Sequence, residues 1–168
     1  ANSTARWNLM GQNVVMAAFL DGRAAPESHR WTDAWDGYPA NRRRLIDHIA
    51  SSGVANPVVL TGDNHAFWVN DLKRDFNDRH APAIATEFVG TSITSFGPPY
   101  DLFMSKMPDN PHVHYFESRK RGYVSVDLSP RQMTTRFRAL SAAADPEATI
   151  GTLATFVVEA GRKGAVSA

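Results

Sequence analysis

The sequence predicts a mixed α/β fold, of the α+β kind, and three observations point to it. An apolar run at residues 58–60, bounded by proline and glycine, is typical of a parallel strand buried on both faces. Residues 39–52 carry apolar side chains at helical spacing behind a proline suited to a first helical turn. Residues 122–128 and 132–140 flank a Ser-Pro-Arg turn, and the first of these segments alternates apolar and polar side chains, so together they predict an antiparallel hairpin.

Composition narrows the class of protein. The chain has 168 residues, 43% hydrophobic and 21% charged, which is ordinary for one globular domain. The net charge of +1 gives no bulk attraction to nucleic acid or to a membrane surface. Cysteine is absent, which excludes disulfides and thiolate metal sites. No apolar run approaches the roughly 18 residues of a membrane span, and no basic-then-apolar signal segment opens the chain.

The two ends of the chain carry separate expectations. The sequence opens with Ala-Asn-Ser and no initiating methionine, so it could be a cleaved product, an engineered piece or the later part of a longer polypeptide. Residues 1–160 are expected to form the domain. Residues 161–168, Gly-Arg-Lys-Gly-Ala-Val-Ser-Ala, are expected to be a disordered tail.

Other elements are predicted from local patterns. The chain in order suggests a buried strand at 14–19 closed by an Asp-Gly turn, a loop at 21–38, helix or loop at 66–71, a strand at 84–89, a long irregular loop at 96–111, and a last strand at 153–158. Loops as long as residues 96–111 are often lids or binding loops.

The segment Gly-Asp-Asn-His follows the predicted central strand. In open α/β sheets, ligands bind beyond the carboxyl ends of the strands. Asp63 and His65 would offer a carboxylate oxygen and an imidazole nitrogen there, with Asn64 between them, and this pair suits a metal ion. A second interpretation stays open. Gly-Asp-Asn is also a common turn, in which Asp63 caps backbone N–H groups and His65 is half-buried.

The segment Trp-Asp-Gly-Tyr-Pro precedes the predicted helix. Trp35 and Tyr38 could line a substrate pocket or pack against the core, while Asp36 could cap the helix. Arg42 lies in the first turns of that helix, where the helix dipole disfavours cations. Its partner could be the phosphate of a substrate, or simply Asp36, Asp47 and water.

Two histidines alternate in the segment Pro-His-Val-His-Tyr. In a strand, His112 and His114 would share one face, so a two-histidine metal pair is conceivable. Arg119, Lys120 and Arg121 follow closely and favour an exposed edge instead.

Taken together, several motifs resemble one family. In order they are W-N-L-M-G-Q-N-V-V-M, W-D-G-Y-P-x-x-R, L-T-G-D-N-H-A-F-W, T-E-F-V-G-T-S-I-T-S and R-G-Y-V-S-V-D-L. The series resembles the carboxyl-terminal part of the PhoD-type alkaline phosphatases, a branch of the metallophosphoesterases. The resemblance runs over residues 6–159.

The resemblance implies a β-sandwich flanked by helices, with a metal site between the sheets that hydrolyses phosphate monoesters or diesters. It implies Asp63 and His65 as catalytic metal ligands, with iron and calcium as the ions, and zinc, manganese or magnesium as alternatives. The substrate-binding residues then expected are Trp35, Tyr38, Arg42 and Asn64. The resemblance also implies export, to the periplasm or the extracellular space.

One departure from the family pattern is large. Metallophosphoesterases take most metal ligands from earlier Asp, Asn and His motifs, and this chain lacks them. The chain therefore resembles the last third of a phosphatase, whose partner would be the missing amino-terminal portion of the same protein. Two alternatives stay open: a phospholipase D-like phosphodiesterase, or a non-catalytic piece that completes or stabilises a partner chain.

Overall fold

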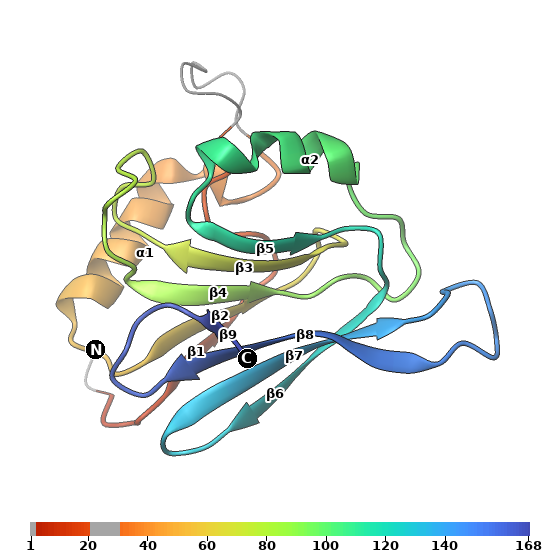
Figure 1. Cartoon of the computed structure of the whole chain (residues 1–168). Helices are drawn as coiled ribbons and strands as arrows, with labels where there is room; N and C mark the ends of the chain where they lie inside the picture. Colours follow the sequence, from red (N-terminus) through yellow and green to blue (C-terminus); the bar gives the residue numbers. More distant parts are fainter. Residues whose placement is uncertain (1–2, 21–30) are drawn as a thin grey trace.

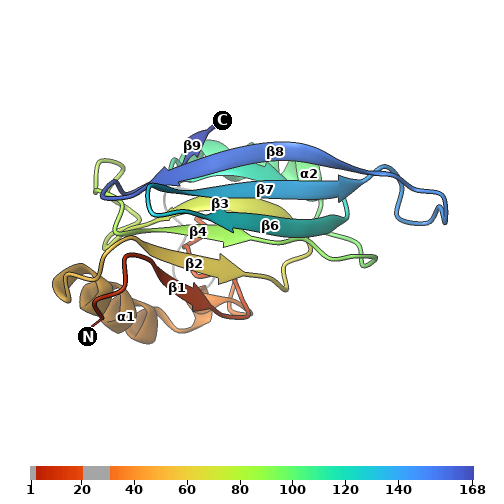
Figure 2. The same ribbon diagram turned by 90° about the horizontal axis from the view of Figure 1, so that it is seen from below.

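The computed structural model describes residues 3–20 and 31–168, which form three layers (Figure 1). A five-stranded sheet, here sheet A, has the strand order β1-β2-β4-β3-β5. Helices α1 and α2 cover one face of sheet A, and a four-stranded sheet B, in the order β6-β7-β8-β9, covers the other (Figures 1 and 2). The predicted mixed α/β fold, a β-sandwich flanked by helices, is confirmed.

The elements have the following bounds. The helices are η2 (Trp35–Gly37), α1 (Pro39–Ser51), α2 (Tyr100–Lys106) and η3 (Met107–Asp109). The strands of sheet A are β1 (Asn8–Gly11), β2 (Pro57–Thr61), β3 (Phe67–Leu72), β4 (Ala85–Val89) and β5 (Val113–Glu117). The strands of sheet B are β6 (Gly122–Leu128), β7 (Gln132–Leu140), β8 (Ile150–Glu159) and β9 (Val166–Ser167).

Sheet A combines both strand orientations. Strands β1, β2 and β4 are parallel, so their carboxyl ends meet at one edge of the sheet. Strand β3 is antiparallel to this set. Strand β5 is antiparallel to β3 and so runs in the same direction as β1, β2 and β4, which brings the end of β5 beside the start of β3 at the same edge. The predicted central strand is β2, whose residues are nearly all buried, as expected of a parallel strand covered on both faces.

Two apolar clusters hold the layers together. Between the sheets, Phe67 and Phe88 of sheet A pack against Phe137 of sheet B, with the Phe67 and Phe137 rings stacked at 4.8 Å between centroids. On the helix side, Trp68 and Phe116 pack against each other and against α2. Burial of each such side chain contributes about 1.5–3 kcal/mol. Both faces of β3 are therefore part of the core.

The prediction of a strand at residues 14–19 is wrong. This segment is buried but irregular, and side chains from other elements satisfy much of its backbone. A strand would need a neighbouring backbone to pair with, whereas here many of the partners are buried polar side chains. The side chains that bond to residues 14–20 come from Gln12, Asp36, Arg42, Glu87, Asn110 and His112.

Glu87, in the middle of β4, makes the most extensive of these contacts. Its carboxylate accepts hydrogen bonds from the backbone N–H groups of Met16 at 2.7 Å and Ala17 at 3.0 Å. It also accepts from the Thr61 hydroxyl at 2.7 Å and the Asn70 amide at 3.0 Å. Complete burial raises the pKa of Glu87, and the four donors oppose that rise. The carboxylate thus fastens the irregular segment to the centre of sheet A.

Three further expectations need correction. Residues 66–71 are not helix or loop but lie in β3, and the long loop at 96–111 contains helices α2 and η3. The tail expected to be disordered contains β9, which pairs with β8 through Val157 and Val166. Of the loop expected at 21–38, residues 21–30 lie outside the described residues, as does the predicted Asp-Gly turn.

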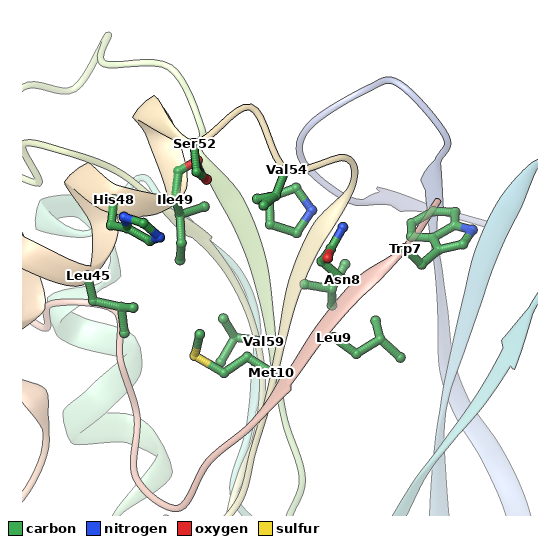
Figure 3. A pocket seen from close by; sticks show the side chains of 12 residues that line it. Trp7, Asn8, Leu9, Met10, Leu45, His48, Ile49, Ser52, Val54 and Val59 are labelled. Atoms are coloured by element: carbon green, nitrogen blue, oxygen red, sulfur yellow. Dashed lines mark hydrogen bonds between the residues drawn. The ribbon is translucent and has the colours of Figure 1, made fainter. Parts of the chain in front are cut away.

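Strand β1 forms one edge of sheet A, and a groove of about 480 Å³ lies between it and α1 (Figure 3). Much of the lining is apolar. It includes Trp7, Leu9, Met10, Leu45, Ile49 and Val54. Leu9 is 44% exposed, so this apolar face continues onto the surface of the edge strand.

Candidate active site

The candidate site lies at the edge of sheet A where the carboxyl ends of β1, β2 and β4 meet. The turn at residues 62–66 leaves β2 there, beside the segments that follow β1 and β4. The Gly62 N–H donates to the Asn13 carbonyl at 3.1 Å, and the Gly90 N–H donates to the Thr61 carbonyl at 2.8 Å. Because these bonds tie all three strand ends together, the turn stands on a rigid base.

The turn itself has an unusual backbone. Asp63 and His65 adopt left-handed conformations, with φ angles of 66° and 58°. Such conformations cost about 1–3 kcal/mol each in a residue with a side chain, and they cluster at active sites and ligand-binding sites. Asn64 between them is buried, and its side-chain oxygen accepts a 2.5 Å hydrogen bond from the Trp68 indole. This bond anchors the turn to the core.

The side chains of Asp63 and His65 present unused donor atoms. The Asp63 carboxylate is exposed and bonds to none of the described residues. The His65 Nδ1 lies 2.9 Å from the Phe96 carbonyl. A carbonyl oxygen only accepts, so Nδ1 carries the proton and Nε2 of the neutral ring keeps its lone pair. A carboxylate oxygen and an unprotonated imidazole nitrogen fit a metal ion.

Within residues 3–20 and 31–168, no cluster of three or more histidines, aspartates and glutamates could hold a metal ion. The two-histidine pair is not formed: His112 is buried with its Nε2 2.7 Å from the Ala18 carbonyl, and His114 bonds Asp71 at 2.8 Å. Burial lowers the pKa of His112 to about 4, so this ring is neutral in the core. A role for Asp63 and His65 as metal ligands stays a prediction.

Of the aromatic residues expected near the site, Trp35 is linked to the carboxyl edge. Its indole N–H donates to the Gln12 side chain at 3.0 Å, and Gln12 donates in turn to the Thr61 hydroxyl at 2.7 Å. Thr61 is the last residue of β2, directly before the candidate turn. Tyr38 is 62% exposed and makes no such link.

Arg42 bonds to a different part of the irregular segment. Its guanidinium is buried, 2.6 Å from the Asp36 carboxylate and 3.3 Å from the Met16 carbonyl, and it lies over the Phe76 ring. Asp36 does not cap the helix, since its second oxygen accepts from the Phe19 N–H at 2.9 Å. In this arrangement the Asp36–Arg42 pair braces the irregular segment, and a phosphate contact by Arg42 stays a prediction.

Comparison with known proteins identifies the family. The PhoD-like phosphatase family model matches residues 1–137. This chain belongs to the PhoD-like phosphatases. It is similar to alkaline phosphatase D of Bacillus subtilis (strain 168), with 39% identity over an alignment of 166 residues, and the match covers 97% of this chain and 28% of the relative. A solved structure described as the structure of PhoD matches 99% of this chain and 32% of its own chain, with 37% identity and a TM-score of 0.87.

These figures confirm the resemblance read from the motifs. They also show that the PhoD-like chain spans less than a third of the length of the relatives it matches.

The sequence of this PhoD-like chain does not predict that the side chain of Arg121 is buried. Arg121, expected at an exposed edge, is only 7% exposed. Its guanidinium donates to the Ser92 hydroxyl at 2.9 Å and to the carbonyls of Ser95 and Ser118. The basic triplet at 119–121 resembles a solvated surface run, and nothing local in the sequence distinguishes its third member.

Proposed function

We propose that the protein containing this chain hydrolyses phosphate esters with the help of bound metal ions, and that Asp63 and His65 are two of the metal ligands. The observation that carries the proposal is the strained turn of residues 62–66. In a PhoD-like chain, it holds a free carboxylate and a free imidazole nitrogen at the carboxyl edge of sheet A. Iron and calcium are the proposed ions, with zinc, manganese or magnesium as alternatives.

In this proposal, residues of the chain bind the metal ions and orient the substrate. Asp63 would supply an anionic oxygen and His65 the Nε2 nitrogen to one or more ions. Bound metal in such sites neutralises phosphoryl oxygens and lowers the pKa of a coordinated water. Trp35, fixed through Gln12, and Tyr38 are proposed to contact the ester, with Asn64 holding the turn in place and reaching substrate only through its remaining amide hydrogens.

The proposed partner of this chain is the rest of the same polypeptide, which the relatives carry as more than two thirds of their length. Among the described residues no strand pairs with the outer edge of β1. This edge and the apolar groove beside α1 are a suitable surface for the partner, because an unpaired strand edge and exposed apolar side chains favour a covering segment (Figure 3). None of the described helices is long and apolar enough to cross a membrane. An exported location, periplasmic or extracellular, is proposed from the family alone.

The first test removes the two ligands. In the full-length protein, Asp63→Asn and His65→Ala are each expected to lower metal content and to reduce phosphatase kcat by at least about 100-fold, because removing a catalytic charge typically costs several kcal/mol. Asn tolerates the left-handed conformation of residue 63, so the fold should persist. Metal content is measured by elemental analysis of the purified proteins and activity with p-nitrophenyl phosphate.

The exposed His80 provides a matched control, since His80→Ala should leave metal content and kcat unchanged. Unchanged metal occupancy in both Asp63→Asn and His65→Ala would contradict the assignment of these residues as metal ligands. Parallel assays with monoester, diester and phospholipid substrates separate a phosphomonoesterase from a phospholipase D-like phosphodiesterase.

A second prediction concerns the chain by itself. Residues 1–168 alone are expected to show no phosphatase activity, because a two-metal site needs more ligands than Asp63 and His65 provide. The measurement is p-nitrophenyl phosphate turnover at neutral to alkaline pH, with excess iron, calcium, zinc or manganese. The full-length protein under identical conditions is the positive control. Metal-dependent turnover by a monodisperse preparation of the chain alone would contradict the idea of a missing half-site.

A further inference from the structure

We propose that Arg121 is a positioning residue for His65: it fixes the segment of residues 92–97, whose Phe96 carbonyl sets the orientation and tautomer of the imidazole. The proposal rests on the proposed role of His65 as a metal ligand. It assigns a function to a buried cation that touches neither Asp63 nor His65 directly.

Arg121 lies between two stretches of chain. Its guanidinium donates to the Ser92 hydroxyl and the Ser95 carbonyl on one side, and to the Ser118 carbonyl on the other. All three acceptors are neutral, and no carboxylate of the described residues forms an ion pair with this guanidinium. A buried guanidinium that bonds only to neutral acceptors on two segments holds those segments together.

Further hydrogen bonds hold the loop between β4 and α2, residues 90–99, in place. The Thr91 hydroxyl donates to the Lys120 carbonyl at 3.0 Å, and the Gly122 N–H donates to the Ser92 carbonyl at 3.0 Å. Within the loop, the Ser92 hydroxyl donates to the Ser95 carbonyl at 2.5 Å. The loop that follows β4 is thus bound through Thr91, Ser92 and Ser95 to the segment between β5 and β6.

Gly97 closes the other side of the loop. A β-carbon at this position would stand 2.4 Å from the His65 carbonyl oxygen and 2.6 Å from that of Ser118. Real β-carbons essentially never come that close, so only glycine lets the loop lie against the backbone of His65. The Phe96 side chain, by contrast, is 95% exposed, so the contact with His65 is made by the backbone of residue 96.

The consequence falls on the histidine ring. With the Phe96 carbonyl fixed 2.9 Å from Nδ1, the neutral ring must carry its proton on Nδ1. Nε2 is then always the unprotonated nitrogen, and the ring is already oriented before a metal arrives. Hydrogen bonds of this kind, from a metal-binding histidine to a carbonyl, typically change metal affinity by about 10–100-fold.

The test uses two variants of the full-length protein, Arg121→Met and Gly97→Ala, with Arg119→Met as the matched control. Arg119 is two residues away, and its guanidinium contacts Glu117 and the Tyr100 ring but not the loop. The first readout is the tautomer of His65, from nitrogen NMR of metal-free protein with labelled histidine rings, assigned with His65→Ala. The second is the dissociation constant of the metal ion, measured by equilibrium dialysis.

The wild type and Arg119→Met are expected to show His65 protonated on Nδ1. Arg121→Met and Gly97→Ala are expected to show a mixture of tautomers and about 10–100-fold weaker metal binding. If the wild-type ring is protonated on Nε2, the proposal is wrong even if neither variant folds. If His65→Ala loses metal while both variants keep wild-type affinity, positioning by Arg121 fails and the ligand assignment survives. If His65→Ala keeps its metal, the ligand assignment fails, and with it the proposal.

Discussion

Glu87→Ala is expected to lower the free energy of unfolding by at least about 3 kcal/mol, since each buried polar group left without a partner costs about 1–3 kcal/mol. The substitution would strand the N–H groups of Met16 and Ala17 and the side chains of Thr61 and Asn70. Because whole domains have about 5–15 kcal/mol of stability, such a variant should melt at a much lower temperature or fail to fold. Thermal and urea unfolding followed by circular dichroism measure the effect.

Glu147→Ala is the control for this experiment. Glu147 is exposed and its side chain makes no hydrogen bond to the described residues, so its replacement should change stability by no more than about 0.5 kcal/mol. A Glu87→Ala variant as stable as Glu147→Ala would show that the carboxylate does not fasten the segment at 14–19.

Arg42→Met is expected to destabilise the protein by about 3–5 kcal/mol, because it leaves the carboxylate of Asp36 buried without its cation. Methionine is close in length to the arginine stem, so the loss comes mainly from the charge. The double variant Asp36→Asn with Arg42→Met is expected to recover part of the loss, since it removes the uncompensated charge. Unfolding free energies of both single variants and the double variant complete the cycle.

Arg43→Met, one residue along α1 and exposed, should be near neutral in the same assay. The steady-state kinetics of the Arg42 variant decide the other role predicted for this side chain. A raised KM with an unchanged melting temperature would indicate contact with the substrate phosphate and contradict the structural interpretation.

The parts of the fold that could be predicted are those in which neighbouring residues settle the structure. An unbroken apolar run predicts strand β2, and a proline followed by apolar side chains at helical spacing predicts α1. Alternating apolar and polar side chains beside a short turn predict the β6–β7 hairpin. Residues 14–19 look like a strand for the same reason, being apolar and bounded by turn formers. They are not one, because Glu87, Asp36 and His112 supply hydrogen bonds from positions far along the chain.

Strand β3 shows the opposite failure. Its polar residues Asn70 and Asp71 suggest a loop, yet Asn70 is fully buried and bonded to Glu87. The residues of the candidate site also differ in how far the sequence predicts their positions. Asp63 and His65 are two residues apart, so the sequence alone shows that their side chains lie close together. Arg121 bonds to residues 26 and 29 positions earlier, and no local sequence pattern indicates such a contact.

The strand order of the two sheets has a consequence for how the chain closes on itself. In sheet B, β6 meets β7 across residues 129–131, and β7 meets β8 across residues 141–149. In sheet A, β1 meets β2 only after residues 12–56 have been bridged. The entropy lost on closing a loop grows with its length, by about 0.6 kcal/mol for each doubling. Sheet B can therefore assemble from pairs of strands that are close in sequence, while the sheet that bears Asp63 and His65 needs the longest connection between any two paired strands of the described residues.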